Sequence, residues 1–215
     1  MDETRNSPGH DPEKSICFTG HRFLPPMERK PLFLRLKTLI RSAAEGGMTS
    51  FFCGGALGFD TLAAEAVLEI RKTCPSIRLH LIIPCRGQAD KWQAADRKKY
   101  QAILAQADEV VILSETYTPG CMMARNMYMV NHASVCICYL TAMRGGTWST
   151  VRYALKQDLN IVNLAVRNSF RSDTLKEGTL WNSTFIFPSA NGNADTALFH
   201  LSAARRGIWK PIRMH

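Results

Sequence analysis

Short apolar runs alternate with longer stretches of helical periodicity over the first three quarters of the chain. In the stretch 28–45, for example, Leu32, Leu36 and Ile40 recur at the spacing that places them on one face of a helix. The expected strands are 15–18, 51–53, 78–83, 109–113, 135–139 and 161–164, and the expected helices are 28–45, 59–73, 90–106, 121–132 and 147–157. Short strands that alternate with helices are typical of an α/β fold with a mostly parallel sheet of about six strands.

Three segments follow from this pattern. Residues 1–14 are polar, carry Pro8 and Pro12, and are expected to form a disordered leader. Residues 15–165 hold the alternating strands and helices and are expected to form one domain. After Ala165 the alternation stops, so 166–215 is a C-terminal extension of unknown role, with an amphipathic helix expected over about 194–206.

Charge adds a preference for anionic partners. Lysine and arginine number 27 against 18 aspartate and glutamate, which gives a formal net charge of +9. Such a balance favours nucleotides, nucleic acid or acidic protein surfaces as partners. The basic residues are scattered along the chain, however, and a solvated surface accounts for much of the excess.

The sequence argues against a membrane protein and against a cysteine-based site. The apolar run 135–140 is too short to span a bilayer, and residues 1–15 contain no apolar signal core. A cytoplasmic location is therefore expected. The seven cysteines form an odd set without a C-x-x-C pair, so we expect neither a disulfide framework nor a zinc site.

Polar and glycine-rich segments follow the expected strands. In an open parallel sheet, ligands bind beyond the carboxyl ends of the strands, so these segments are predicted to share one edge. They are Thr19, Gly20, His21 and Arg22; Gly54, Gly55, Gly58 and Asp60; Pro84 to Gln88; Ser114 to Tyr117; and Arg144 to Thr147.

Two of these segments are candidates for binding phosphate. Gly54-Gly55 with Gly58 precedes one helix, and Gly145-Gly146-Thr147 precedes another. Glycines let backbone N–H groups approach a phosphate, and the positive end of the helix dipole adds to the attraction. Neither segment matches the dinucleotide fingerprint or the P-loop. The alternatives are a simple glycine-rich turn for the first segment and N-capping by Thr147 for the second.

Four further side chains carry two interpretations each. Arg22 and Arg125 are suited to clamping a phosphate, or extend to solvent. His21 is a candidate general acid or hydrogen-bond donor, although a single loop histidine is usually neither. Trp92 belongs to the core or stacks on a base.

The motifs together resemble the YpsA-like branch of the SLOG superfamily over residues 15–165. The resemblance rests on their order and spacing: Thr19 to Arg22, Gly54 to Asp60, Pro84 to Trp92, Tyr117 to Cys121 with Arg125-Asn126, and Gly145 to Thr147. It implies a Rossmann-like domain that binds a nucleotide or a nucleotide-derived ligand through these residues, with Pro84, Gln88 and Asn126 among them.

Better-characterised members of that superfamily include cytokinin-activating phosphoribohydrolases and DNA-processing proteins that bind single strands. In the hydrolases, the loop Pro-Gly-Gly-x-Gly-Thr-x-x-Glu carries the catalytic glutamate. Here Arg144 stands in place of the proline and Arg152 in place of the glutamate. Because a carboxylate stabilises the oxocarbenium-like state of glycosidic cleavage, hydrolysis would need Asp60, Glu65 or Glu115 instead.

The sequence therefore favours a module that binds a nucleotide or an ADP-ribose-like ligand as a sensor or regulator, with no required cofactor and no metal. An N-glycosidase acting on a nucleotide, with Asp60 or Glu65 as its weak catalytic candidates, is the first alternative. A protein that binds single-stranded nucleic acid is the second. Self-association into a homo-oligomer is left open.

Overall fold

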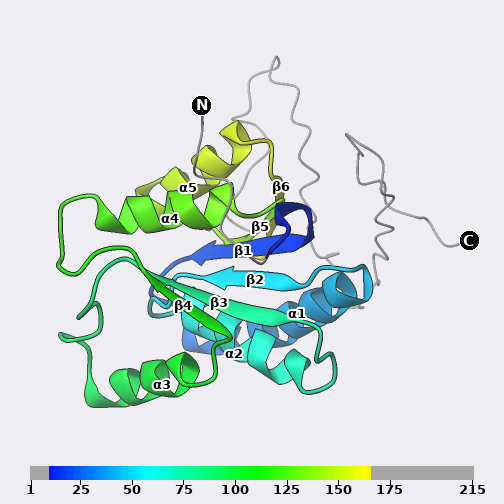
Figure 1. Cartoon of the computed structure of the whole chain (residues 1–215), viewed down its shortest axis with the longest axis horizontal. Helices are drawn as coiled ribbons and strands as arrows, with labels where there is room; N and C mark the ends of the chain where they lie inside the picture. The colour runs from blue at the N-terminus through cyan, green and yellow to red at the C-terminus, as the bar shows by residue number, and fades with distance from the viewer. Residues whose placement is uncertain (1–9, 166–215) are drawn as a thin grey trace, which may run out of the picture.

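The computed structural model describes residues 10–165, and these form one six-stranded sheet in which every neighbouring pair of strands is parallel. The strand order is β4-β3-β2-β1-β5-β6 (Figure 1). The strands are β1 (Ser15–Gly20), β2 (Ser50–Cys53), β3 (Arg78–Ile83), β4 (Glu109–Ile112), β5 (Val135–Tyr139) and β6 (Asn160–Asn163). The prediction of an α/β fold with a mostly parallel sheet is confirmed.

Five α-helices cover the two faces of this sheet (Figure 1). They are α1 (Pro26–Glu45), α2 (Phe59–Arg71) and α3 (Ala94–Leu104) on one face, and α4 (Cys121–Asn131) and α5 (Gly145–Lys156) on the other. The chain steps outward from β1 to β4, then returns to the other side of β1 for β5 and β6. Since crossover connections are right-handed, this reversal of direction changes the face on which the helices pack.

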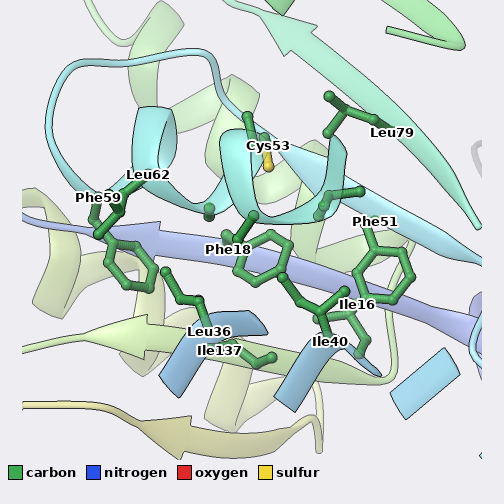
Figure 2. Close-up of a cluster of buried hydrophobic side chains, with 14 of the residues drawn as sticks. Ile16, Phe18, Leu36, Ile40, Phe51, Cys53, Phe59, Leu62, Leu79 and Ile137 are labelled. Carbon is green, nitrogen blue, oxygen red and sulfur yellow. The ribbon is translucent and has the colours of Figure 1, made fainter. Parts of the chain in front are cut away.

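The larger hydrophobic cluster lies between the sheet and helices α1 and α2. Figure 2 shows Phe18 and Phe51 from neighbouring strands with Leu36 and Ile40 of α1. The adjacent Phe52 belongs to the second cluster, under α4 and α5. Successive side chains of a strand point to opposite faces, so one apolar run supplies both layers of the core.

Several sequence expectations change at the ends of elements. Pro12–Lys14 forms a short 3-10 helix whose N-cap is Asp11, so the expected disorder does not extend to these residues. The third helix begins at Ala94, four residues later than expected, and Trp92 lies in the turn before it. The expected extension 166–215, with its helix over 194–206, and residues 1–9 of the leader lie outside the described residues.

Residues 10–165 contain neither a membrane-spanning helix nor a cluster of metal-binding side chains. Among residues 10–165, no helix combines the length and the apolar composition needed to cross a membrane. The same part of the chain contains no group of three His, Cys, Asp or Glu side chains that could hold a metal ion.

A cluster of histidines packs the start of the described chain against the face of the sheet that α4 and α5 cover. The ring centroid of His10 lies 4.9 Å from that of Phe52, 5.2 Å from that of His132 and 5.8 Å from that of His80. Nδ1 of His80 lies 2.7 Å from a carboxylate oxygen of Glu109. Burial lowers the pKa of His10, the neighbouring His132 and His80 lower it further, and Glu109 acts in the opposite direction.

This cluster predicts a loss of stability in mild acid. Because the folded protein holds the pKa of His10 below its ordinary value, the unfolded chain binds the proton first as the pH falls. The free energy of unfolding should therefore decrease as the pH drops through the ordinary pKa of histidine, about 6.5, and towards the lowered value. His10→Phe, which keeps a ring against Phe52, should make this decrease shallower and leave stability at pH 8 nearly unchanged. Urea unfolding at a series of pH values measures both, and an unchanged pH dependence in His10→Phe would contradict the prediction.

Candidate functional site

The carboxyl ends of the strands carry the candidate site, and its centre lies just beyond the ends of the hydrogen-bonded neighbours β1 and β5. The chain leaves β1 towards α1 on one face of the sheet and leaves β5 towards α5 on the other. Connections that diverge in this way leave a crevice between them, which is where open α/β sheets bind ligands. The segments 19–22 and 144–147, predicted to share an edge, lie on the two sides of this crevice.

His21 joins the two sides of the crevice. Its Nε2 accepts a hydrogen bond from the Thr141 amide at 3.1 Å and lies 3.0 Å from the Thr141 hydroxyl. An acceptor at Nε2 places the proton of the neutral ring on Nδ1, and burial lowers the pKa of His21, which favours that neutral form. His21 therefore holds the loop after β1 against the loop after β5.

The glycines after β1 and β2 are required for close packing. A Cβ on Gly20 would lie 2.4 Å from the ring of Phe59. A Cβ on Gly54 would lie 2.0 Å from Nη1 of Arg125. Gly58 has a φ of +79°, and a Cβ there would lie 2.2 Å from the carbonyl oxygen of Arg22. These positions need glycine because other parts of the protein occupy the space where a side chain would stand.

The glycine loop after β2 turns its polar groups inward. The Ala56 amide lies 3.4 Å from the Asp60 carboxylate, and the Phe59 amide donates to the His21 carbonyl at 3.1 Å. Gly54, Gly55 and Gly58 are buried. Two backbone amides of the segment that was predicted to bind phosphate, those of Ala56 and Phe59, therefore already have partners within the protein.

A buried ion pair lies beneath this loop. Nη1 of Arg125 is 3.9 Å from Oδ2 of Asp60, and both residues are only 5% exposed. Nη1 also donates to the Gly54 carbonyl, and Nε donates to Asn126 Oδ1 at 2.7 Å. Burial raises the pKa of Asp60, an effect that Arg125 and the Ala56 amide oppose, and burial lowers the pKa of Arg125, an effect that Asp60 opposes. Arg125 does not extend to solvent.

A chain of hydrogen bonds connects this pair to the second glycine segment. Nδ2 of Asn126 donates to Thr150 Oγ1 at 2.7 Å, and the Thr150 hydroxyl donates to the Gly146 carbonyl at 3.0 Å. The two segments that sequence analysis proposed for phosphate are therefore joined through Arg125, Asn126 and Thr150.

The N-terminus of α5 differs from the loop after β2 because it is open. Gly145 and Gly146 are exposed, and a Cβ on either would meet no atom within 4 Å. The N-cap residue is Arg144, whose side chain makes no capping hydrogen bond. Thr147 is buried inside the helix, so the alternative in which it caps α5 is wrong. The N–H groups of Gly145, Gly146 and Thr147 donate to no other backbone group within residues 10–165, as is usual for the first turn of a helix.

The loop after β3 supports the glycine loop rather than opening towards a ligand. Nε2 of Gln88 donates to the Gly55 carbonyl at 3.1 Å and lies 3.4 Å from the hydroxyl of Tyr100. Trp92 packs edge-on against Tyr100, with ring centroids 5.3 Å apart, and Pro84 is buried. Of the two interpretations given to Trp92, this contact favours packing within the protein.

The candidate carboxylates are all held by basic partners. Asp60 pairs with Arg125, Glu65 lies 3.2 Å from Lys99, and the exposed Glu115 pairs with Arg86 on the surface. None of the three stands unpaired beside the β1/β5 crevice.

One carboxylate near the crevice, that of Glu28, was not among the site residues predicted from the sequence. It lies in the first turn of α1 and accepts a hydrogen bond from the Tyr139 hydroxyl at the end of β5. Its sequence signal was weak, because an acidic residue in the first turn of a helix usually only complements the dipole. Thr141 was missed as well, since its role depends on His21, 120 positions away in the sequence.

The buried pair predicts an asymmetric response to mutation. Asp60→Ala should lower the free energy of unfolding by about 3–5 kcal/mol, because it leaves the Arg125 guanidinium buried without its counter-charge. Glu65→Ala, at a partly exposed pair on the same helix, should cost no more than about 1 kcal/mol. Urea unfolding measures both losses.

A double-mutant cycle isolates the interaction. Asp60→Asn combined with Arg125→Met should be clearly less destabilising than the sum of the two single changes, because the double variant contains no unpaired buried charge. Additive losses would show that the pair does not couple the loop after β2 to α4.

Comparisons with known proteins agree with the resemblance drawn from the motifs. The sequence model of the YspA SLOG family matches residues 30–168. The chain is similar to the uncharacterised SPbeta prophage-derived protein YoqJ of Bacillus subtilis, with 28% identity over 145 residues that cover 60% of this chain and 85% of YoqJ. It is also similar to the UPF0398 protein BH1768 of Halalkalibacterium halodurans, with 38% identity over 93 residues, 42% of this chain and 49% of that protein.

Two solved structures share the fold. DNA processing protein A from Helicobacter pylori superposes with a TM-score of 0.53 at 24% identity, over 71% of this chain and 65% of that chain. DNA processing protein A from Streptococcus pneumoniae superposes with a TM-score of 0.51 at 18% identity, over 69% of this chain and 49% of that chain.

Proposed function

We propose that this chain, which belongs to the YspA SLOG family, binds a nucleotide or nucleotide-derived phosphorylated ligand at the β1/β5 crevice and acts as a sensor or regulator. The observation that carries the proposal is the open N-terminus of α5, where Gly145 and Gly146 leave the first backbone N–H groups uncovered. These groups and the helix dipole attract an anion.

Two arginines add positive charge at the same edge of the sheet. Arg22 is exposed. Within residues 10–165 its only side-chain hydrogen bond is a weak one, from Nη2 to the sulfur of Met122 at 4.0 Å. Nη2 of Arg125 makes no hydrogen bond within residues 10–165, and this atom is not completely enclosed by the protein. Both guanidinium groups therefore retain donors suited to a phosphate.

The arrangement of carboxylates favours binding over glycosidic cleavage. Cleavage of a ribosyl bond calls for a carboxylate that can stabilise the developing positive charge or activate water. Asp60 is committed to Arg125 and Glu65 to Lys99, while Arg152 stands where related hydrolases carry the glutamate. A site of this composition suits recognition of a phosphorylated ligand without turnover.

A matched pair of variants tests the anion site at α5. Gly146→Asp and Gly146→Asn place side chains of nearly the same size in open space, and only the first adds a negative charge. Gly146→Asp should weaken binding of AMP and ADP-ribose by at least about 10-fold, because like charges a few Å apart repel strongly at a partly desolvated site. Gly146→Asn should bind much more tightly than Gly146→Asp.

Stability separates this effect from unfolding. An acidic residue in the first turn complements the helix dipole, so Gly146→Asp should be as stable as the parent or more stable by about 0.3–1 kcal/mol. Isothermal titration calorimetry and thermal unfolding give the two readouts. Equal affinities for the Asp and Asn variants, or no binding of any member of a nucleotide and ADP-ribose panel, would overturn the proposed function.

A second candidate function is binding of single-stranded nucleic acid. Exposed aromatic side chains follow strands at two positions of the same edge, Phe23 after β1 and Tyr117 after β4. Aromatic side chains beside a basic groove are the usual platform for unpaired bases. The Helicobacter pylori protein with the same fold is described as having a single-stranded DNA binding mode.

Salt dependence distinguishes the two candidates. A strand that contacts several phosphates should give a log–log slope of affinity against salt of several units, whereas a mononucleotide should give a much shallower one. An oligothymidylate titration at a series of salt concentrations supplies the slope.

A further inference from the structure

Exposed apolar side chains gather at the β1/β5 crevice. Phe23 is 78% exposed, Met27 is 90% exposed and Met143 is 48% exposed. Phe23 and Met27 belong to the segment that leaves β1 and starts α1, and Met143 belongs to the segment that leaves β5. Large apolar side chains held this far into solvent in one region commonly mark a surface that a partner covers.

The contact between His21 and Thr141 sets the positions of Phe23 and Met143. The two hydrogen-bonding residues face each other across the crevice, and each of the two apolar residues follows one of them by two positions. Two residues span at most about 7 Å of extended chain. Phe23 and Met143 therefore each lie close to the bonded pair, one on the segment that leaves β1 and the other on the segment that leaves β5.

Each apolar side chain also lies next to a group that suits phosphate. Arg22 directly precedes Phe23, and Met143 is followed by Arg144 and the open first turn of α5. The crevice thus offers positive charge and apolar surface side by side. A nucleoside phosphate has the matching composition, with a flat apolar ring system attached to an anionic group.

We infer that the nucleobase of the ligand lies between Phe23 and Met143, above the His21–Thr141 contact. The phenyl ring stacks on the base, and the thioether supplies a polarisable contact to its other side or edge. Nδ1 of His21, which carries the ring proton, has no acceptor among residues 10–165 and is available to an acceptor on the base. The inference rests on the proposed function and extends it, because it makes the ligand a nucleoside phosphate rather than a sugar phosphate.

The test compares ligands with and without a base. AMP, GMP, CMP, UMP and ribose 5-phosphate are titrated by calorimetry into the full chain, into Phe23→Ala and Met143→Ala, and into Leu34→Ala as a control. Leu34 is 53% exposed on α1, two helical turns beyond Met27, and is not part of the loops that line the crevice.

The expected result is selective for the base. Phe23→Ala should weaken binding of the preferred nucleoside monophosphate by about 5- to 150-fold, the range that follows from loss of one base–aromatic stack. Its affinity for ribose 5-phosphate should stay within about 2-fold of the parent value, and Leu34→Ala should change neither. Phe23→Trp should keep the nucleotide affinity and show quenched tryptophan fluorescence on binding.

The outcomes separate this inference from the function on which it rests. If nucleotides and ribose 5-phosphate bind the parent equally well, or if Phe23→Ala weakens both alike, the base does not stack on Phe23 and the inference is overturned, while the anion site at α5 stands. If no compound of the panel binds the parent, the proposed function and the inference fall together. Circular dichroism and thermal unfolding of each variant show that a loss of binding is not a loss of the fold.

Discussion

The buried ion pair of Arg125 and Asp60 organises the carboxyl edge of the sheet. Two charges that are each 5% exposed have lost most of their hydration, and their attraction offsets that loss only when their geometry is fixed and their remaining donors and acceptors are satisfied. Arg125 meets this condition through the Gly54 carbonyl and the Asn126 side chain. The loop after β2, the start of α2 and the middle of α4 are therefore held in one arrangement, and Asn126 extends that arrangement through Thr150 to the start of α5.

This constraint explains why two similar glycine segments have different roles. Gly54 lies against the guanidinium of Arg125, and Gly58 lies against the backbone of Arg22, so both are glycine because there is no room for a Cβ. Gly145 and Gly146 both face open space, but Gly145 has a φ of +75°, which itself favours glycine, so only Gly146 has neither a neighbour within residues 10–165 nor a backbone angle that calls for glycine. Packing requires glycine at the first pair of positions. At the second pair it does not: the backbone angle accounts for Gly145, and the approach of a ligand to the backbone of α5 would account for Gly146 under the proposed function.

The helices and strands were easier to predict from the sequence than the contacts between residues far apart in it. The apolar runs located all six strands, and 78–83 and 135–139 were predicted with the bounds that the structure has. The location of Arg125 within a mostly apolar helix was visible, but its burial was not, because Asp60 is 65 positions away and nothing local marks the pairing. The helix expected over 147–157 begins at Gly145 instead, two residues earlier, since a Gly-Gly-Thr segment fits a helix that begins at the threonine as well as one that begins at the first glycine. Trp92 was placed in a helix for a related reason, because the polar segment before Ala94 has helical composition and its turn is stabilised by contacts with Tyr100.

The distribution of charge at this edge determines which chemistry it suits. Asp60, Glu65 and Glu115 each have a basic partner, and Glu28 accepts the hydrogen bond of the Tyr139 hydroxyl. Each carboxylate is thereby held in place or neutralised, which removes repulsion that an incoming phosphate would otherwise meet. The cost is reactivity, because Asp60 is buried against Arg125 and Glu28 accepts the hydrogen bond of a phenol, so neither carboxylate is free to reach a ribose or to activate a water. Under the proposed function, an edge built in this way would favour retention of a phosphorylated ligand over its conversion, which is the property that the proposed sensor or regulator requires.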